Sequence, residues 1–338
     1  MDGSQAAGAT CAGLLRQLPA PFDVPAVAAR LAAGAGGGSG AGSAPDPGEP
    51  LGVVLLQELT RANGLLRVMR ASLGALAGAL AGARALTRDL QALAACLVGG
   101  RVPPAWAAAA VHPSTLPLGG WLADLSSRLR HLATWADAGA PPAVLWLPAF
   151  ARPGALLTAL LQAHARRTGL PVDALELECL PTQAGSARAL REPPPDGGAY
   201  VGGLVLEGAA WDTEGGCLVE PEPMQLSCAM PVVHLRPREA APATPAPTAA
   251  TAAALTGAPS GAAAAAAAGA QHPAAAAHAP PATYLCPLYQ SPLRCADALG
   301  RPSFVAAFHL PAGALEPAAW VLRGVALLCA APARGAAP

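Results

Sequence analysis

Apolar residues between positions 51 and 95 recur at steps of three and four, the spacing that places side chains on one face of an α-helix. They include Val54, Leu55, Leu59, Leu65, Leu66, Met69, Leu73, Leu76 and Leu80. Arginines fall largely between them, so the pattern predicts a long soluble helix followed by a second one. Similar patterns over 118–135 and 156–167 predict two further amphipathic helices. Proline pairs at 103–104 and 141–142 separate these stretches, because proline interrupts a helix.

A shorter apolar pattern covers residues 11–31 and is interrupted by the segment Leu18-Pro-Ala-Pro-Phe-Asp23. The prolines predict an extended segment, and the carboxylate of Asp23 can cap a helix that starts just after it. Residues 144–147 form a short buried run between the last two predicted helices.

The pattern changes after Gly169, where short runs rich in Val, Leu, Tyr and Phe alternate with turn residues. These strand-like runs cover 174–180, 199–206, 216–219, 230–236, 284–289, 303–310 and 320–329. Several short strands separated by turns predict a small antiparallel sheet or barrel. The predicted fold is therefore α+β: an N-terminal helical bundle followed by a small antiparallel β-barrel.

Two low-complexity inserts interrupt this plan. Residues 34–50 are mostly Gly, Ser, Ala and Pro, as in a flexible linker, and the glycines of residues 34–42 lack the strand-to-helix context of a phosphate-binding loop. Residues 238–282 are mostly Ala, Pro, Thr and Gly, with almost no charge. They cannot bury enough surface to fold alone, so we predict a disordered insert within a hairpin loop.

The composition excludes several classes of function. The 338 residues suffice for one large domain or two ordinary ones, and the net charge of +0 gives no electrostatic case for a nucleic acid or a membrane as partner. All 21 basic residues are arginine. A protein without lysine can form neither a Walker A phosphate loop nor a Schiff-base enzyme.

Cysteine usage points to reduced thiols. The eight cysteines are Cys11, Cys96, Cys179, Cys217, Cys228, Cys286, Cys295 and Cys329. None are spaced as C-x-x-C, and the pairs Cys217/Cys228 and Cys286/Cys295 lack the spacing of zinc ligands, so we expect no metal. The N-terminus lacks the basic start and apolar core of a signal peptide, which favours a cytosolic or ciliary location.

Candidate catalytic groups are few. Glu207 and Asp212 are paired carboxylates, but a turn-stabilising or inter-module role is favoured over glycosidase chemistry, because nothing else in the sequence indicates supporting polar residues or a sugar-binding cleft. His234 lies between apolar residues and is expected to be a satisfied sheet histidine. The serines at 186, 227 and 303 lack a G-x-S-x-G elbow. We predict no catalytic residue and no cofactor.

Two other groups of residues are interpreted as structural. Trp106, Trp121, Trp135 and Trp146 fit core positions, although the sequence does not separate a core from an interface. The arginines at 166, 167, 188 and 191 make a modest basic patch that is interpreted as a solvated face, with contact to an acidic protein surface as the alternative.

Several blocks of residues are informative because of their order along the chain. The most specific is Gly198-Ala-Tyr-Val-Gly-Gly-Leu-Val-Leu-Glu-Gly-Ala-Ala-Trp-Asp212. The others include Leu18–Asp23, Leu55–Leu59, Gly100–Pro103, Met230–Pro237, Tyr284–Tyr289 and Trp320–Cys329. In this order they are similar to the C-terminal domain of dynein heavy chains, of axonemal rather than cytoplasmic type.

The resemblance implies a division of the sequence. Residues 1–33 resemble the end of the sixth AAA+ module, 34–50 form the linker, and 51–181 form the helical half of the C-terminal domain. Residues 182–338 form the barrel half, interrupted by the insert at 238–282. Members of this family begin far upstream, so this chain is expected to be either a truncated gene product or a separate protein.

The resemblance also implies a function: a non-catalytic domain that packs on the AAA+ ring modules of a dynein heavy chain and modulates microtubule-based movement. Its implied partners are those modules and other subunits of the dynein complex, with the microtubule contacted only indirectly. Its implied location is the cytoskeleton of the cytoplasm, in the axoneme of a cilium or flagellum. The alternative is a free-standing protein-binding module that docks in trans on a dynein or another ciliary complex.

Overall fold

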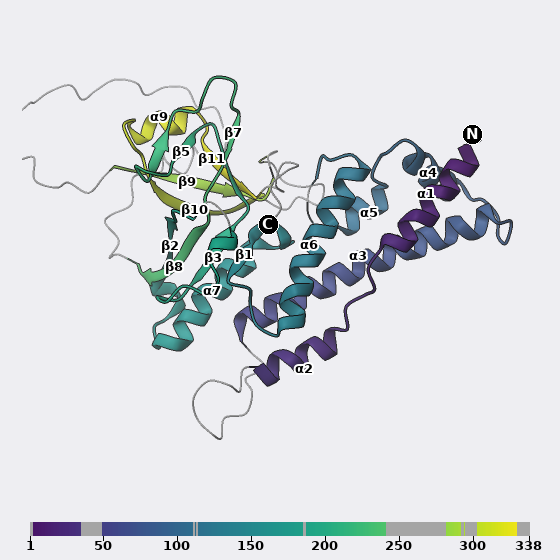
Figure 1. The fold of residues 1–338 in the computed structure, drawn as a ribbon, viewed down its shortest axis with the longest axis horizontal. Helices are drawn as coiled ribbons and strands as arrows, with labels where there is room; N and C mark the ends of the chain where they lie inside the picture. Colours follow the sequence, from purple (N-terminus) through teal and green to yellow (C-terminus); the bar gives the residue numbers. More distant parts are fainter. Residues whose placement is uncertain are drawn as a thin grey trace, which may run out of the picture.

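The computed structural model describes residues 3–34, 49–110, 112, 114–184, 187–240, 282–291, 294 and 303–329. The bulk of both predicted inserts, residues 35–48 and 241–281, lies outside the described residues, so their predicted disorder stays a prediction. The protein is α+β, as expected, with the helices before residue 140 gathered on one side and the strands, together with the later helices, on the other (Figure 1).

Helices come first along the sequence. They are α1 (Gly3–Gln17), α2 (Val24–Gly34), α3 (Pro50–Leu80), α4 (Arg88–Val98), α5 (Pro104–Ala109) and α6 (Leu118–Ala138). The predicted long helix followed by a second is confirmed by the 31-residue α3 and by α4. Asp23 caps α2 as predicted, since its Oδ1 accepts from the Ala26 N–H at 3.0 Å. Helix α5 was not predicted, because the proline pair at 103–104 indicates only a break in the sequence pattern. Proline also permits a helix to begin, as Pro104 does here.

Strands and two further helices follow. They are β1 (Val144–Trp146), α7 (Pro153–Thr168), β2 (Leu175–Pro181), β3 (Ala199–Gly202), β4 (Leu204–Glu207), β5 (Ala210–Asp212), β6 (Cys217–Val219), β7 (Ser227–Ala229), β8 (Val233–Glu239), β9 (Thr283–Tyr289), β10 (Phe304–Pro311), α9 (Pro317–Leu322) and β11 (Ala326–Cys329). Short 3-10 turns lie at η2 (Leu147–Ala149), η3 (Val172–Ala174) and η4 (Ala187–Ala189). Strands β5 and β7 were not predicted.

The strands form three sheets within the described residues: β1-β3-β8-β2, β10-β9-β11-β4-β7 and the hairpin β5-β6. They do not close into the antiparallel barrel that the pattern predicted. Two pairs, β1 with β3 and β9 with β11, are parallel. Parallel neighbours need a crossover, which α7 and β2 supply in the first case and β10 and α9 in the second. A sequence pattern does not reveal such pairings.

Two strand boundaries also differ from the prediction. The run at 320–329 begins as helix α9 and becomes strand only at Ala326, because Pro317 starts a helix that carries Trp320 into the core. Strand β8 continues to Glu239, two residues into the predicted insert at 238–282, since Leu175 pairs with Glu239 at its end.

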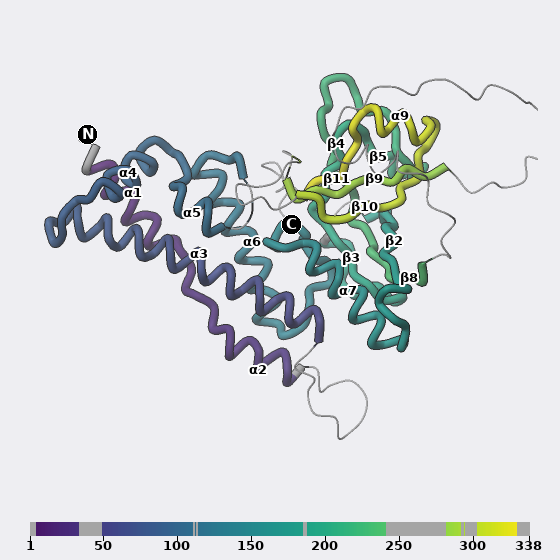
Figure 2. The backbone as a smooth tube through the Cα atoms, turned by 180° about the vertical axis from the view of Figure 1, so that it is seen from behind, coloured from purple at the N-terminus to yellow at the C-terminus, as the bar shows by residue number. Residues whose placement is uncertain are grey.

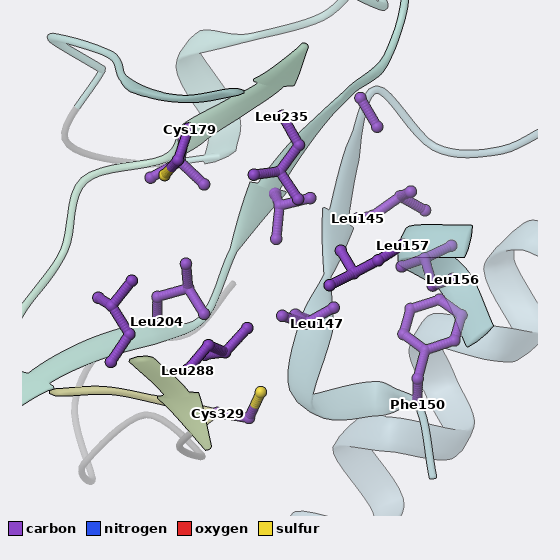
Figure 3. Packing of buried hydrophobic residues seen from close by; sticks show 14 of the residues in the cluster. Leu145, Leu147, Phe150, Leu156, Leu157, Cys179, Leu204, Leu235, Leu288 and Cys329 are labelled. Atoms are coloured by element: carbon purple, nitrogen blue, oxygen red, sulfur yellow. The ribbon is translucent and has the colours of Figure 1, made fainter. Parts of the chain in front are cut away.

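Two hydrophobic cores fill the molecule. The sheet core includes Leu55, Leu59, Trp135, Phe150, Leu156, Val201, Leu206, Leu288, Trp320 and Leu327, and the helical core includes Cys11, Leu14, Leu66, Met69, Leu73, Trp106, Trp121 and Leu125. In the sheet core, residues of β1, η2 and α7 pack against the strands, with Leu147 and Leu157 pointing toward Leu204 and Leu288 (Figure 3). Helices α3 and α6 contribute to both cores.

None of the helices in the described part of the protein combines the length and the hydropathy that a bilayer crossing requires.

Candidate functional site

A band of polar residues crosses α3 and α6 where one core gives way to the other. Along α3 the change falls between Leu59 and Leu65, and along α6 between Leu129 and Leu132. We call this band the polar layer. It comprises Glu58, Arg61 and Asn63 from α3, His112 from the α5–α6 connection, and Asp124, Arg128 and His131 from α6.

Glu58 is the most deeply buried member, with 2% of its surface exposed. Its Oε2 accepts the Ala151 N–H at 2.9 Å, and its Oε1 accepts the Arg152 N–H at 3.2 Å and the Arg61 guanidinium at 2.8 Å. Helix α7 begins at Pro153 with no side-chain cap of its own. The Glu58 carboxylate supplies that cap from α3, because it accepts backbone N–H groups at the positive end of the helix dipole.

Ala151 is also hydrogen-bonded to the strand part of the protein. The Gln290 side chain at the end of β9 donates to the Ala151 carbonyl at 2.8 Å. The N–H of Ala151 therefore donates to a side chain of α3, and its carbonyl accepts from a side chain at the end of β9. Burial raises the pKa of the Glu58 carboxyl, whereas the backbone N–H of Ala151 and the charge of Arg61 lower it.

Asn63 fixes the connection between α1 and α2. Its Oδ1 accepts the Phe22 N–H and its Nδ2 donates to the Phe22 carbonyl, both at 2.8 Å. Phe22 packs against both cores. The two hydrogen bonds place this residue at the level of the polar layer.

A buried ion pair completes the layer on α6. The Arg128 Nε donates to the Asp124 Oδ2 at 2.7 Å, and the guanidinium lies 6.0 Å from the ring centre of Trp146 in β1. His112 stacks on Trp121, and its Nε2 is 3.9 Å from the Asp124 Oδ2. Burial, then the charge of Arg128, lowers the pKa of His112 to about 4, so the ring is neutral at neutral pH.

His131 links α6 to the first strand. Its Nε2 accepts the Trp146 N–H at 3.2 Å, which requires that nitrogen to be unprotonated. Burial lowers the pKa of His131 to about 4, in keeping with this acceptor role.

A small pocket lies inside the polar layer. Its volume is about 30 Å³, and its polar lining comes from Glu58, Arg61, His112 and Arg128. A space of this size is large enough to hold a water molecule. Two nearby atoms, the Nε2 of His112 and the Oδ1 of Asp124, find no hydrogen-bond partner among the described residues.

The hydrogen bonds of the polar layer connect separate elements of the fold. The bonds at Glu58, Gln290 and His131 each join one element to another: α3 to α7, β9 to α7, and α6 to β1. Within the described ranges, no three His, Cys, Asp or Glu side chains gather as metal ligands do. Sequence reasoning missed Glu58 as a site residue. The signal was an acidic residue set between Leu55 and Leu59, on the apolar face of a helix.

The two predicted carboxylates lie in structural positions. Glu207 ends β4 and forms an ion pair with Arg294 at 3.1 Å. Asp212 ends β5, and its Oδ1 accepts the Glu214 N–H at 3.0 Å in the turn that leads to β6. Asp212 thus stabilises its own turn, whereas Glu207 pairs with a residue of the segment that follows β9.

The glycines of the same motif are required by close packing. Gly203 has a φ of +83°, and a Cβ there would lie 2.4 Å from the ring of Trp146. The turn between β3 and β4 therefore seats directly on the indole that also contacts Arg128. This accounts for the glycine at position 203 in the most specific motif of the sequence.

The remaining candidates fall into the framework. The His234 ring bonds to the Gly197 carbonyl at 2.7 Å, as a satisfied sheet histidine would. Trp106, Trp121, Trp135 and Trp146 are all buried. Cys217 and Cys228 are free thiols and Cys286 is buried, while Cys295 and Ser186 lie outside the described residues.

The other serines and the arginines do not assemble a site. Ser227 is exposed in β7, and Ser303 is buried beside the start of β10. Arg167 contacts His164 one turn earlier in α7 at 3.1 Å, and Arg188 lies in the separate turn η4.

Comparison with known proteins relates this sequence to dynein heavy chains. A family model, described as the C-terminal domain of the dynein heavy chain, matches residues 2–253. The human protein named dynein axonemal heavy chain 2 is 36% identical over 283 residues, 84% of this chain. The Chlamydomonas reinhardtii dynein-1-beta heavy chain of the flagellar inner arm I1 complex is 35% identical over 315 residues, 93% of this chain. The present sequence spans about 6% of the length of either relative.

Proposed function

Because this protein belongs to the family of C-terminal domains of dynein heavy chains, we propose that it is a non-catalytic brace within a dynein motor. In this role it packs on the AAA+ ring modules of a dynein heavy chain and modulates microtubule-based movement. The names of the relatives support an axonemal dynein, and hence a place in the axoneme of a cilium or flagellum. Residues 1–33 would lie at the boundary with the ring.

The polar layer is the observation that carries this proposal. A brace must transmit a displacement from one end to the other without yielding, and here two helices pass through both cores. Glu58 joins α3 to the start of α7 across 93 residues of sequence, and Gln290 joins that point to β9. A partner shifts a conformational equilibrium only through contacts that differ between two states. A rigid domain that spans several ring modules can make such differential contacts.

The test places this domain in a working motor. The segment of the Chlamydomonas dynein-1-beta heavy chain that matches it would be replaced by residues 1–338, and microtubule gliding velocity and ATP turnover would be measured. Glu58→Ala should change gliding velocity by at least about twofold, since residues within coupling networks modulate coupling by about 0.5–2 kcal/mol. Glu49→Ala, an exposed residue just before α3, is the matched control and should have no effect.

Two outcomes would contradict the proposal. If deletion of residues 198–330 from the replacement segment left gliding velocity and ring stability unchanged, the bracing role would be contradicted. Equal effects of Glu58→Ala and Glu49→Ala would separate the polar layer from that role. Recovery of the free 338-residue protein on intact heavy chains would instead favour docking in trans.

A further inference from the structure

The two larger sheets are parts of one continuous sheet. The chain passes from β3 through Gly203 directly into β4, and these strands are opposed to β8 and β7 in one unbroken register, from Ala199↔Leu235 to Val205↔Ala229. Beyond these four strands lie β2 on one side, and β11, β9 and β10 on the other. The strands at the two ends of this order are therefore β2 and β10.

These two end strands lie side by side without pairing. Their Cα atoms approach within 8 Å. Within the described part of the chain, each pairs on one side only, β2 with β8 and β10 with β9. Helix α7 lies beside both strands (Figures 1 and 2). We call the space between β2 and β10 the seam. An unpaired strand edge is a template on which a further strand can form.

Backbone groups of β2 point into the seam. In an antiparallel ladder, residues that bond to the neighbouring strand alternate with residues whose N–H and carbonyl face away from it. The Thr182 N–H donates to the carbonyl of Val232, directly opposite, at 2.8 Å, so the even-numbered residues of β2 are those that bond to β8. The backbone groups of Leu177 and Cys179 therefore face the seam.

Strand β10 presents a matching edge. The Ala312 N–H donates to the carbonyl of Ala282, directly opposite, at 2.8 Å, so the even-numbered residues of β10 bond to β9. Ala307 and His309 therefore turn their backbone groups toward the seam. The pairings from strand to strand make β2 and β10 run in the same direction. One strand that runs antiparallel to both can thus bond to both.

The seam contains a groove of about 360 Å³. Residues 176–179 of β2 and 305–309 of β10 line it, together with part of α7. Leu177, Cys179 and Phe308 belong to the sheet core or pack against it, so the inner side of the groove is apolar. A strand between two others separates them by about 9.6 Å, so β2 and β10 must part by about 2 Å where they are closest. This movement breaks no ladder between them.

The outer rim of the seam is acidic along β2. Glu176 pairs with Arg238 at 2.7 Å, and Glu178 pairs with Arg236 at 2.6 Å. Both arginines belong to β8, on the side of β2 away from the seam. A carboxylate accepts hydrogen bonds at both oxygens, so each glutamate can also pair with a cationic side chain of a strand added in the seam.

These features define the occupant. The side chains that face inward should be apolar and those that face outward cationic, in the alternation of a β-strand. Residues 241–281 of this chain contain no lysine or arginine and are mainly Ala and Pro, which strands disfavour. We propose that the seam binds an extended segment of a second protein, in which apolar residues alternate with arginine or lysine, as an added strand. This site does not depend on the proposed bracing role.

The probe is a synthetic peptide as long as β2, seven residues, in which valine and arginine alternate. Fluorescence anisotropy of the labelled peptide with the complete 338-residue protein should show saturable binding. Methylation of the central backbone nitrogen of the peptide should weaken binding at least about tenfold, because an added strand binds through its backbone. A peptide with glutamate in place of arginine should bind at least about fivefold more weakly.

Variants of the protein test the same contacts from the other side. Leu177→Pro removes the N–H that faces the seam and leaves the ladder to β8 intact, so binding should weaken at least about tenfold. Leu177→Ala is the matched control: it also removes the leucine side chain but keeps the N–H, and should retain most of the affinity. The double variant Glu176→Gln, Glu178→Gln should weaken binding of the arginine peptide about fivefold and spare a peptide with threonine instead.

Far-UV circular dichroism checks that each variant folds. If Leu177→Pro does not fold, the methylated peptide gives the same answer with the unaltered protein. No saturable binding, or equal binding of the methylated and unmethylated peptides, would overturn the inference. Binding that appears only when a Gly/Ser linker replaces residues 241–281 would show that the chain's own segment covers the seam, and would overturn the choice of a second protein. A dimer that the peptide dissociates in sedimentation would do the same in favour of a second copy.

Discussion

The helical core and the sheet core are built from the sequence in opposite ways. The helical core uses neighbouring segments, α1, α3 to α5 and the first half of α6. The sheet core draws on α2, both shared helices, α7 and strands that end only at Cys329. The first spans residues 11–129 and the second residues 27–329, so contacts in the second reach farther along the sequence. Contacts between residues far apart in sequence slow folding.

The difference shows what the polar layer does. Without it, the two cores would be joined by the apolar faces of α3 and α6 and by Phe22, which packs against both cores. With it, the beginning of α7, the end of β9 and the edge strand β1 are each bonded to the shared helices or to one another. The sheet core thus takes its position from the helical bundle. We expect the two cores to behave as one unit despite their different construction.

The largest effects should come from removing one large side chain in either core. Trp106 and Trp320 are each fully buried, one per core, and each indole N–H donates a hydrogen bond at 2.9 Å. Trp106→Ala and Trp320→Ala should each lower the free energy of unfolding by about 3–5 kcal/mol through the cavity left behind. Urea unfolding followed by far-UV circular dichroism would measure both. Two separate transitions, with each variant affecting only one, would show that the two cores unfold independently.

Removing the Glu58 side chain should have the next largest effect. Glu58→Ala leaves two backbone N–H groups and the Arg61 charge without their acceptor, which should cost about 3 kcal/mol. Glu58→Gln keeps one acceptor oxygen and should cost less, about 1–3 kcal/mol. Thermal unfolding of both variants beside Glu49→Ala would measure the order. A loss for Glu58→Ala no larger than that for Glu49→Ala would show that the cap on α7 contributes nothing.

Two glycine substitutions test whether contact with Trp146 constrains the turn between β3 and β4. Gly203→Ala adds a Cβ at a φ of +83° and 2.4 Å from the Trp146 ring, so it should cost about 2–3 kcal/mol. Gly216→Ala, at a φ of +64° with open space around it, should cost only the backbone strain of about 1 kcal/mol. Urea midpoints at constant slope give both values. Equal costs would mean that contact with Trp146 does not constrain the turn.

The smallest effect expected is a pH dependence at His131. Its pKa falls from 6.5 to about 4 on folding, so between these values the unfolded state binds more protons and stability declines as the pH falls. Between pH 6.5 and 5.5 this group alone should remove about 1 kcal/mol. His131→Gln keeps an acceptor for the Trp146 N–H but does not titrate.

Unfolding free energies at both pH values, for both proteins, isolate the contribution of His131. His112 and Glu58 titrate in each protein, so their contributions cancel in the difference. An identical pH dependence with and without His131 would contradict the neutral acceptor role.

Sequence reasoning recovered the helical core better than the sheet core, for a physical reason. The buried leucines of α3 identify its buried face by their spacing alone, because each is followed by another within two helical turns. The pairing of β1 with β3 depends on α7 crossing between them, and no local pattern encodes it. Trp320 was placed in a strand because an apolar run fits either element, and the helix start at Pro317 decided otherwise.

The polar layer was hidden for the same reason. Glu58 was visible as an acidic residue among leucines, but its partners are backbone groups 93 and 94 residues away. The charge of a residue and its position in a sequence pattern do not reveal that its partner is a distant backbone group. The family resemblance, by contrast, rested on ordered blocks and is confirmed by the match over residues 2–253.

Native-state hydrogen exchange tests most directly whether the two cores form one body. The measurement compares amides of residues 65–76 of α3, in the helical core, with those of β11, in the sheet core. If the polar layer unites the cores, both sets should open with the same free energy, equal to that of global unfolding. Opening of the helical core at a clearly lower free energy, while β11 stays protected, would contradict the account.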